Sequence, residues 1–175
     1  MFNPEKLIWV NAEYIKISPP EQVAQALVPL LEAAGLKAEV QTVSANWLGQ
    51  LVVLVKERAK TLVEMVEWVR PYFGQAVTFD EEAAKKFLTS AIAPILGKLL
   101  TRFEAYPVFS KQTWEKAFKQ LVEEEGVKMG QLAQPVRVAL TGRTASPGLF
   151  DVMEVLGRDR TLFRLRQGIE RAKIS

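Results

Sequence analysis

The chain has 175 residues, of which 49% are hydrophobic and 25% are charged, a balance typical of a globular protein with its own core. It contains no cysteine and no histidine, which excludes disulfides and sulfur- or imidazole-bound metals, so we expect no metal and no other cofactor. Apolar runs stay short of the roughly 20 residues of a membrane-spanning helix and no signal-peptide pattern opens the chain, so we expect a cytoplasmic protein without a membrane partner.

The first part of the chain is predicted to be helical. Residues 18–21 form a capping box with proline at the first helical position, and they begin a helix that Pro29 should kink and Gly35 should end. A longer helix is expected from the spacing of apolar residues between 55 and 73, with its end at Arg70 and Pro71. The apolar run 51–55 is interpreted as helix leading into it, and a buried strand is the alternative.

Helical spacing continues through the second part. A second capping box at residues 78–81 begins a helix that runs to Phe103 and bends near Pro94. Further helices are expected around 114–122, ended by Gly126, and after Asp159. Tyr106 and Pro107 mark the predicted linker. The sequence therefore predicts an all-α fold of two consecutive helical bundles, residues 1–105 and residues 106–175.

Residues 134–157 carry the most specific pattern. Ser146 is expected to cap a short helix with Pro147 in its first turn, and Gly157 should end it. The apolar residues of this helix follow its period: Leu149, Phe150, Met153 and Leu156. We expect Phe150 to belong to the core.

Charge is distributed unevenly along the chain. Residues 128–175 carry a net charge of +5, whereas residues 1–127 carry −2. A basic segment of this kind is typical of proteins that bind a polyanion. A solvated arginine face on the last helix is the alternative.

The phrase Gln-Pro-Val-Arg-Val-Ala-Leu-Thr-Gly at 134–142, followed by Pro-Gly-Leu-Phe at 147–150, resembles the C-terminal anticodon-binding region of bacterial glutamyl-tRNA synthetases. Residues 2–15, 126–131 and 157–162 are also similar to that family, so the resemblance covers the chain from end to end. Enzymes of this class activate their amino acid with a His-x-Gly-His phrase and a Lys-Met-Ser-Lys-like loop, and this sequence has neither. The resemblance therefore implies an RNA-binding part of a glutamate–tRNA ligase that does not aminoacylate by itself. Its expected partners are tRNA(Glu) and the catalytic domain of the same enzyme, and we expect a monomer.

The resemblance also implies a set of anticodon-binding residues. Arg137 is the first of them, because a guanidinium can stack on a base and donate a fork of hydrogen bonds. Ser146, Pro147 and Leu149 match the turn that faces the anticodon in the family. Lys119 lies where a basic family residue approaches the anticodon.

Tyr72 matches a family position that judges the third anticodon base. Enzymes restricted to tRNA(Glu) can carry arginine at this position. The tyrosine here implies a relaxed choice that also admits tRNA(Gln), while an ordinary half-buried aromatic is the alternative.

Other cationic residues are candidate phosphate contacts: Arg143, Arg158, Arg160 and Arg164. One arginine of this region is expected to pair with Asp159 or Glu170. We expect the tryptophans to be core residues rather than stacking platforms. Residues 2–9 nevertheless have the apolar character of an interface for the catalytic half, which a buried Trp9 would exclude.

Two other classes of function compete with RNA binding. A helical protein-interaction adaptor whose basic face meets an acidic protein is the main alternative. A free-standing enzyme has less support, since Glu123, Glu124 and Glu125 are typical of a solvated helix end rather than an acid–base pair.

Overall fold

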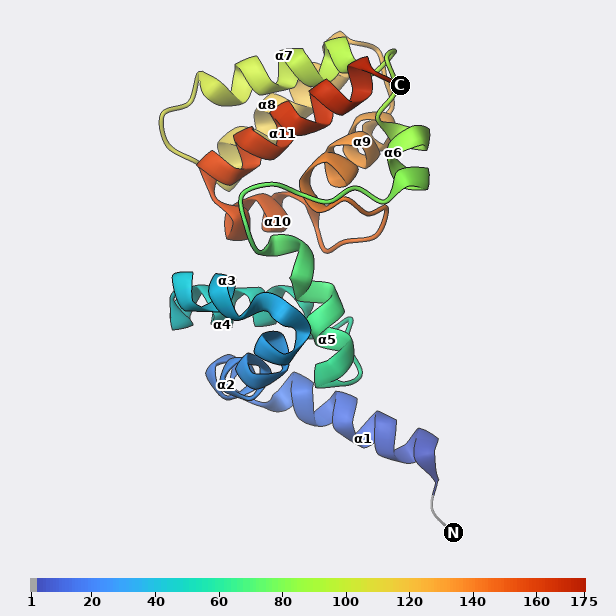
Figure 1. Ribbon diagram of the computed structural model, residues 1–175. Helices are drawn as coiled ribbons and strands as arrows, with labels where there is room; N and C mark the ends of the chain where they lie inside the picture. Colours follow the sequence, from blue (N-terminus) through green and yellow to red (C-terminus); the bar gives the residue numbers. More distant parts are fainter. Residues whose placement is uncertain (1–2) are drawn as a thin grey trace. The chain divides into compact units, whose positions relative to one another are not determined.

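The computed structural model describes residues 3–175, and Phe2, part of the expected N-terminal interface, lies outside the described residues. Within the described range the regular structure is helical, which confirms the predicted all-α class. The α-helices are α1 Pro4–Ile17, α2 Pro20–Leu31, α3 Lys37–Thr42, α4 Ala45–Val55, α5 Leu62–Val69, α6 Glu81–Phe87, α7 Ala93–Glu104, α8 Lys111–Glu124, α9 Met129–Thr141, α10 Leu149–Leu156 and α11 Arg158–Lys173 (Figure 1).

The chain divides into two compact units, Met1–Phe73 and Gly74–Ser175. In the first, α2 packs against α4 and α5. Their facing sides supply the buried residues of this unit's core, including Leu27, Leu31, Leu51, Val55 and Met65. The run 51–55 is thus the last part of α4, which confirms the helical interpretation and excludes the strand.

The predicted helix over 55–73 is wrong, because one helix ends at Val55 and another begins at Leu62. The hydroxyl of Thr61 accepts the Glu64 amide at 3.0 Å, and the Glu64 carboxylate accepts the Lys60 amide at 2.9 Å. These bonds satisfy backbone amides at the start of α5, so they favour the beginning of a new helix here over continuation of α4. After α2, a π-helical turn at Glu32–Leu36 contains Gly35 with φ +86°, the predicted interruption.

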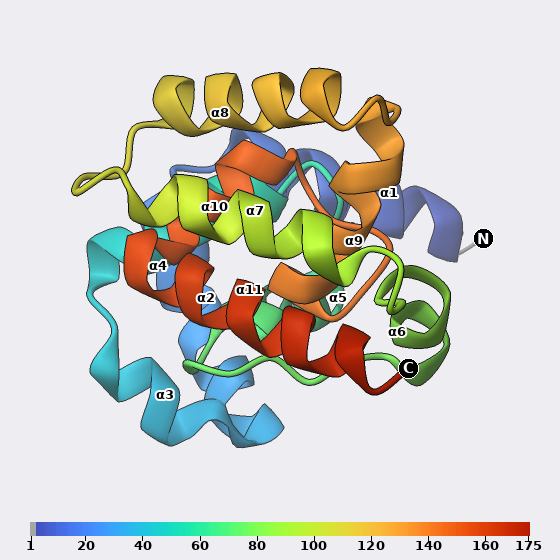
Figure 2. The same ribbon diagram turned by 90° about the horizontal axis from the view of Figure 1, so that it is seen from above.

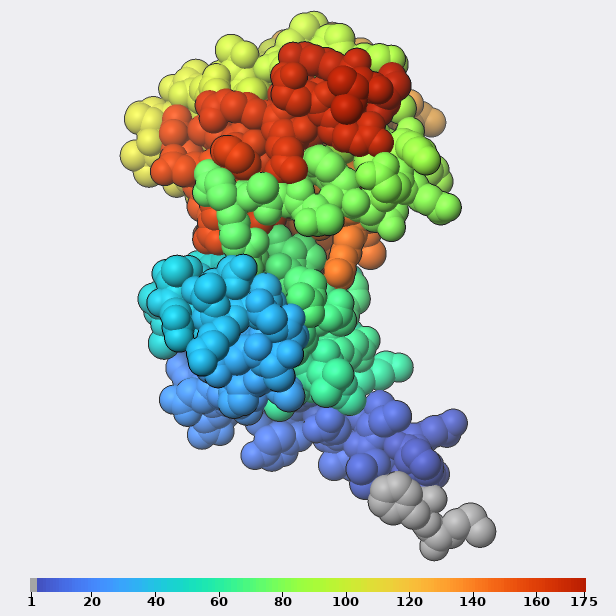
Figure 3. Space-filling model, in the orientation of Figure 1, coloured from blue at the N-terminus to red at the C-terminus, as the bar shows by residue number. Residues whose placement is uncertain are grey.

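Helix α1 is attached to its unit only by its second half. Ala12 and Ile15 are buried, and Lys56 donates to the Lys16 carbonyl at 3.1 Å. Figure 3 shows the blue atoms of α1 leaving the body of this unit. Trp9 is 63% exposed, so it is not the core residue expected of a tryptophan, and the expected open surface near it is confirmed.

In the second unit α11 packs against α7 and α9, while α8 packs against α7 and α10 (Figures 1 and 2). Phe103 stacks on the fully buried Trp114 with ring centroids 4.1 Å apart, so this tryptophan is a core residue as predicted. The predicted helix from 81 to 103 is broken between Phe87 and Ala93. Pro94 lies in the first turn of α7, where a missing amide removes no hydrogen bond.

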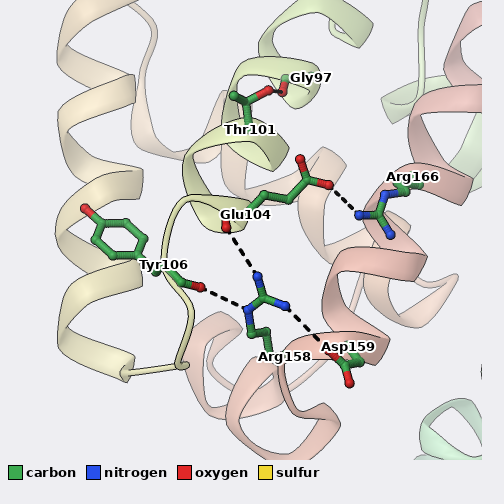
Figure 4. A network of polar contacts seen from close by, with 7 residues as sticks. All are labelled: Gly97, Thr101, Glu104, Tyr106, Arg158, Asp159 and Arg166. Carbon is green, nitrogen blue, oxygen red and sulfur yellow. Dashed lines mark hydrogen bonds and ion pairs between the residues drawn. The ribbon is translucent and has the colours of Figure 1, made fainter.

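The expected boundary between residues 105 and 106 falls inside this second unit. Arg158 at the start of α11 donates to the Tyr106 carbonyl at 3.0 Å and to the Glu104 carbonyl at 3.3 Å, and Arg166 pairs with the Glu104 carboxylate (Figure 4). The connection that composition marks as a linker is therefore fixed to α11. Across residues 3–175, no helix has both the length and the apolar character needed to cross a bilayer.

Candidate nucleic-acid interface

Arg137 lies in α9 and holds the turn that precedes α10. Its Nη1 donates to the Ser146 carbonyl at 3.2 Å and to the Pro147 carbonyl at 2.9 Å, and it also contacts the Ser146 hydroxyl. Ser146 and Pro147 are buried, whereas Arg137 remains partly exposed. The guanidinium thus fixes the turn while keeping part of its surface open to solvent.

The start of α10 differs from the prediction. Gly148 occupies the N-cap and Leu149 is the first helical residue, so Ser146 is not the cap and Pro147 is not in the first turn. The Ser146 hydroxyl instead donates to the Pro147 carbonyl at 2.9 Å, and the contact with Arg137 engages it further. The predicted stop is confirmed, since Gly157 has φ +77° and its amide bonds to the Met153 carbonyl at 2.9 Å.

Asp151 gives the beginning of α10 a negative charge. It lies in the first helical turn, and a Cβ at Gly148 would come within 2.5 Å of its Oδ2. Lys111 at the beginning of α8 pairs with this carboxylate. That hydrogen bond, with the nearby negative charges, raises the pKa of Lys111 against a smaller lowering by burial. Lys111 thus offsets the negative charge that Asp151 brings to the beginning of α10.

The structure brings only some of the predicted anticodon residues together. Arg137, Ser146 and Pro147 are in direct contact, and Leu149 follows them, buried at the start of α10. Lys119 lies on another helix, α8, where it is exposed and pairs with Glu115 at 2.7 Å. Phe150 contacts Phe118 edge-to-face at 5.5 Å, as expected of a residue that packs inward.

Tyr72 does not lie open to an RNA base in this structure. Its side chain is only 2% exposed, in a 3-10 turn at Arg70–Tyr72. The expected base contact is therefore contradicted, and the half-buried alternative understates the burial. Val69 at the end of α5 is also buried, as is Phe73. Tyr72 therefore belongs to a run of core residues.

Arg164 is a further correction among the candidate phosphate contacts. It is fully buried, and its guanidinium donates to the backbone carbonyls of Gln75, Leu140 and Gly74. A phosphate outside the fold has no access to it. Sequence spacing could have indicated this, because Arg164 stands three residues after Thr161 and four before Gly168 on the buried face of α11.

The three remaining candidate arginines differ in their hydrogen bonds and in their exposure to solvent. Arg158 donates to two carbonyls and pairs with Asp159 at 3.6 Å, which confirms the expected ion pair (Figure 4). Arg160 donates to the Leu156 carbonyl at 2.9 Å, and burial lowers the pKa of its guanidinium. Arg143 is partly exposed and follows α9 directly, with its amide bonded to the Thr141 hydroxyl at 3.3 Å.

Lys111, Asp151 and Gln167 support this region and were missed by the sequence analysis. Lys111 and Asp151 are separated by 40 residues, and Gln167 reaches a partner 90 residues away. No local pattern carries contacts of that range. Within residues 3–175, His, Cys, Asp and Glu side chains form no group of three that could hold a metal ion.

The helical fold and the turn held by Arg137 can be compared with known classes of protein. A family profile described as an anticodon binding domain matches residues 22–169, and the chain belongs to that family.

The relatives point to one kind of synthetase. The chain is 44% identical over 169 residues to the glutamate–tRNA ligase of Geobacter sulfurreducens and 43% identical to that of Syntrophobacter fumaroxidans. Each match covers 97% of this chain and 35% of the relative, so the chain spans about a third of their length. It corresponds to their anticodon-binding region.

A solved structure agrees with these sequence matches. The crystal structure of a glutamate tRNA ligase from Elizabethkingia meningosepticum superposes with a TM-score of 0.79 at 26% identity. The match covers 97% of this chain and 32% of that one. A second structure, from Elizabethkingia anophelis, gives a TM-score of 0.74.

Proposed function

We propose that this chain recognises the anticodon loop of tRNA(Glu) for a glutamate–tRNA ligase and contributes binding rather than chemistry. The observation that carries the proposal is the turn at Ser146–Pro147, which a partly exposed arginine of α9 holds in one conformation. Anticodon bases are unstacked, so a protein reads them with planar groups and with backbone donors and acceptors. A fixed turn beside a guanidinium offers both.

Residues around this turn have different roles in RNA binding, according to their chemistry. Arg137 stacks on a base or donates to its edge, and Ser146, Pro147 and Leu149 shape the surface that the base meets. Lys119 and Arg143 contact phosphates, because Lys119 is exposed on α8 and Arg143 is partly exposed just after α9. Arg158 and Arg160 add positive charge near the phosphates, and each also donates to a backbone carbonyl.

The test is binding of the whole chain to a tRNA(Glu) anticodon stem–loop and to versions with single anticodon substitutions, each over a series of salt concentrations. Loss of a good arginine–base contact corresponds to about 1–3 kcal/mol, so Arg137→Ala should bind the cognate loop roughly tenfold or more weakly. Arg102→Ala is the matched control, since it removes the same charge from the ion pair with Glu124 on the same unit. Equal binding of all anticodons, or equal losses in both variants, would reject the assigned site.

Relaxed choice between tRNA(Glu) and tRNA(Gln) is part of the proposal. Position 72 carries a buried tyrosine, so it does not supply the positive charge that the family resemblance associates with restriction to tRNA(Glu). We expect the two stem–loops to bind within about threefold of each other, well below the tenfold that corresponds to 1.4 kcal/mol. Competition between labelled tRNA(Glu) and unlabelled tRNA(Gln) loops measures this ratio directly, and a large preference would refute it.

The catalytic part of the same ligase is the partner that α1 fits. Leu7, Val10, Tyr14 and Ile17 recur at spacings of three and four and are between 49% and 78% exposed. Such a stripe on a helix normally packs against another element, and the relatives are about three times as long as this chain. The chain should therefore act with the catalytic part covering this stripe.

A pull-down with a separately produced catalytic part of a glutamate–tRNA ligase tests the stripe. Leu7→Glu together with Ile17→Glu should abolish association, because two charges would enter an apolar contact. Val63→Glu is the control, since Val63 is a similarly exposed apolar residue on α5 of the same unit. Association of the double variant at wild-type strength would exclude this surface, and self-association of the wild-type chain would assign it to a second copy.

A further inference from the structure

Arg164 connects three parts of the second unit from inside the core. Its Nη1 donates to the Leu140 carbonyl at 2.6 Å, its Nε to the Gln75 carbonyl at 3.2 Å and its Nη2 to the Gly74 carbonyl at 3.1 Å. Leu140 belongs to the last turn of α9, whose carbonyls lack partners within the helix. A cation at this end also complements the helix dipole.

The segment that Arg164 holds, residues 74–80, is attached to α9 and α11 by further bonds. The Gln167 side chain accepts the Val77 amide at 2.9 Å and donates to the Val77 carbonyl at 2.7 Å, as a neighbouring strand would. The Asp80 amide donates to the Gly142 carbonyl at 2.9 Å. Segment 74–80 is thus bonded to α11 at its start and in its middle, and to the residue after α9 at Asp80.

Burying a guanidinium is unfavourable unless its donors are satisfied, and an apolar side chain of similar size is often as stable. Arg164 differs from such a side chain in directing three donors to fixed carbonyls. One of those carbonyls lies three residues after Arg137 on α9, and the Thr141 hydroxyl bonds back to the Arg137 carbonyl at 2.9 Å. Arg164 is therefore bonded to the last turn of α9, and that turn is also bonded to Arg137.

We propose that Arg164, supported by Gln167, is a positioning residue that holds the end of α9 and segment 74–80 in the register that presents Arg137 and its turn to the anticodon. This inference rests on the proposed function. Arg164 itself touches no RNA. Its effect on binding passes through α9.

Variants at Arg164 separate positioning from plain stability. Arg164→Lys keeps the charge but cannot reach three carbonyls, and Arg164→Met keeps the volume without donors. Leu165→Ala, a core variant on the same helix, is the control for lost stability without loss of these hydrogen bonds. Binding of cognate and substituted anticodon loops is measured at a temperature where all four proteins are folded by circular dichroism.

Both Arg164 variants should lose about tenfold in cognate affinity, comparable with a lost charge-assisted hydrogen bond, while Leu165→Ala keeps wild-type affinity. Amide hydrogen exchange should accelerate at Val77 and Asp80 in the Arg164 variants, because segment 74–80 loses its attachment. Gln167→Glu is an independent variant, since it keeps the acceptor for the Val77 amide but replaces the donor to the Val77 carbonyl. It should accelerate exchange at Val77 and weaken binding in the same direction.

The outcomes distinguish the two proposals. A wild-type chain that ignores the anticodon would overturn both the proposed function and the positioning role. A wild-type chain that reads the anticodon, with Arg164 variants matching Leu165→Ala in affinity and in exchange at Val77 and Asp80, would overturn the positioning role alone.

Discussion

Gly142 shows how strictly one residue at the end of α9 is constrained. Its φ is +74°, and a Cβ would overlap the carbonyl oxygen of Thr78. Gly126 has a similar φ of +63° but open space where a Cβ would stand. The two glycines therefore separate backbone strain from steric overlap.

Gly142→Ala should lower the free energy of unfolding by more than the ~1–2 kcal/mol of left-handed strain, because overlap with Thr78 adds to it. Gly126→Ala should lose only about that strain. Urea denaturation of both variants measures the difference. Equal losses of unfolding free energy would mean that segment 74–80 moves away from the new Cβ without loss of stability.

Tyr72 should contribute to stability as a core residue does. Tyr72→Ala removes a side chain that is 2% exposed, so we expect a loss of about 3–5 kcal/mol, as for other large aromatic truncations. Tyr14→Ala is the control, since that tyrosine is 65% exposed on α1 and should change stability little. Thermal denaturation compares the two, and a small effect at position 72 would contradict its burial.

At the scale of elements, polar contacts join helices that already pack against each other. Arg158 and Arg166 of α11 hold the end of α7, and Lys111 of α8 holds α10 through Asp151. The contact with Asp151 also changes the titration of Lys111. Its pKa is raised from the ordinary 10.5, chiefly by the hydrogen bond to Asp151.

The Lys111 contact should therefore depend on pH in a defined direction. A raised folded-state pKa means that the contribution is fully present below pH 10.5 and is lost as the pH rises through the folded-state value. The difference in melting temperature between the wild type and Lys111→Met should stay constant from neutral pH to about 9.5, where a group of this pKa remains protonated, and shrink above it. Lys119→Met removes an exposed pair within one helix and serves as the comparison. A difference that grows with rising pH would contradict the assignment.

At the scale of the molecule, the two compact units predict which fragment folds. Residues 74–175 contain α7 and α11 together, whereas residues 106–175 lack the buried α7 residues Leu96, Leu99 and Phe103. The 74–175 fragment should melt cooperatively, and the 106–175 fragment should not, because α8 and α11 would expose their α7-facing sides. Circular dichroism melts of both fragments test the boundary. Cooperative melting of 106–175 would support the boundary at 105/106 that the sequence predicts.

Much of the fold and part of the site follow from local sequence. Apolar spacing places most of the helices, Gly157 ends α10, and Trp114 lies in the core, because helical period and left-handed glycine stops act within a few residues. The phrase around Arg137 identifies the family from residue types alone. Apolar spacing does not reveal the helix breaks after Val55 and Phe87, because it continues across both. The cap at Thr61 and the first-turn proline Pro94 begin new helices there.

Tertiary structure decided which polar and aromatic residues are available for binding. Arg164 and Tyr72 carry groups that suit RNA recognition, yet both are buried, and Ser146 serves Arg137 rather than capping a helix. The partners of Arg164 on segment 74–80 lie about ninety residues away. Sequence by itself determined the helical class and the family, because those depend on local period and residue identity. Burial and contact depend on segments that only folding brings together.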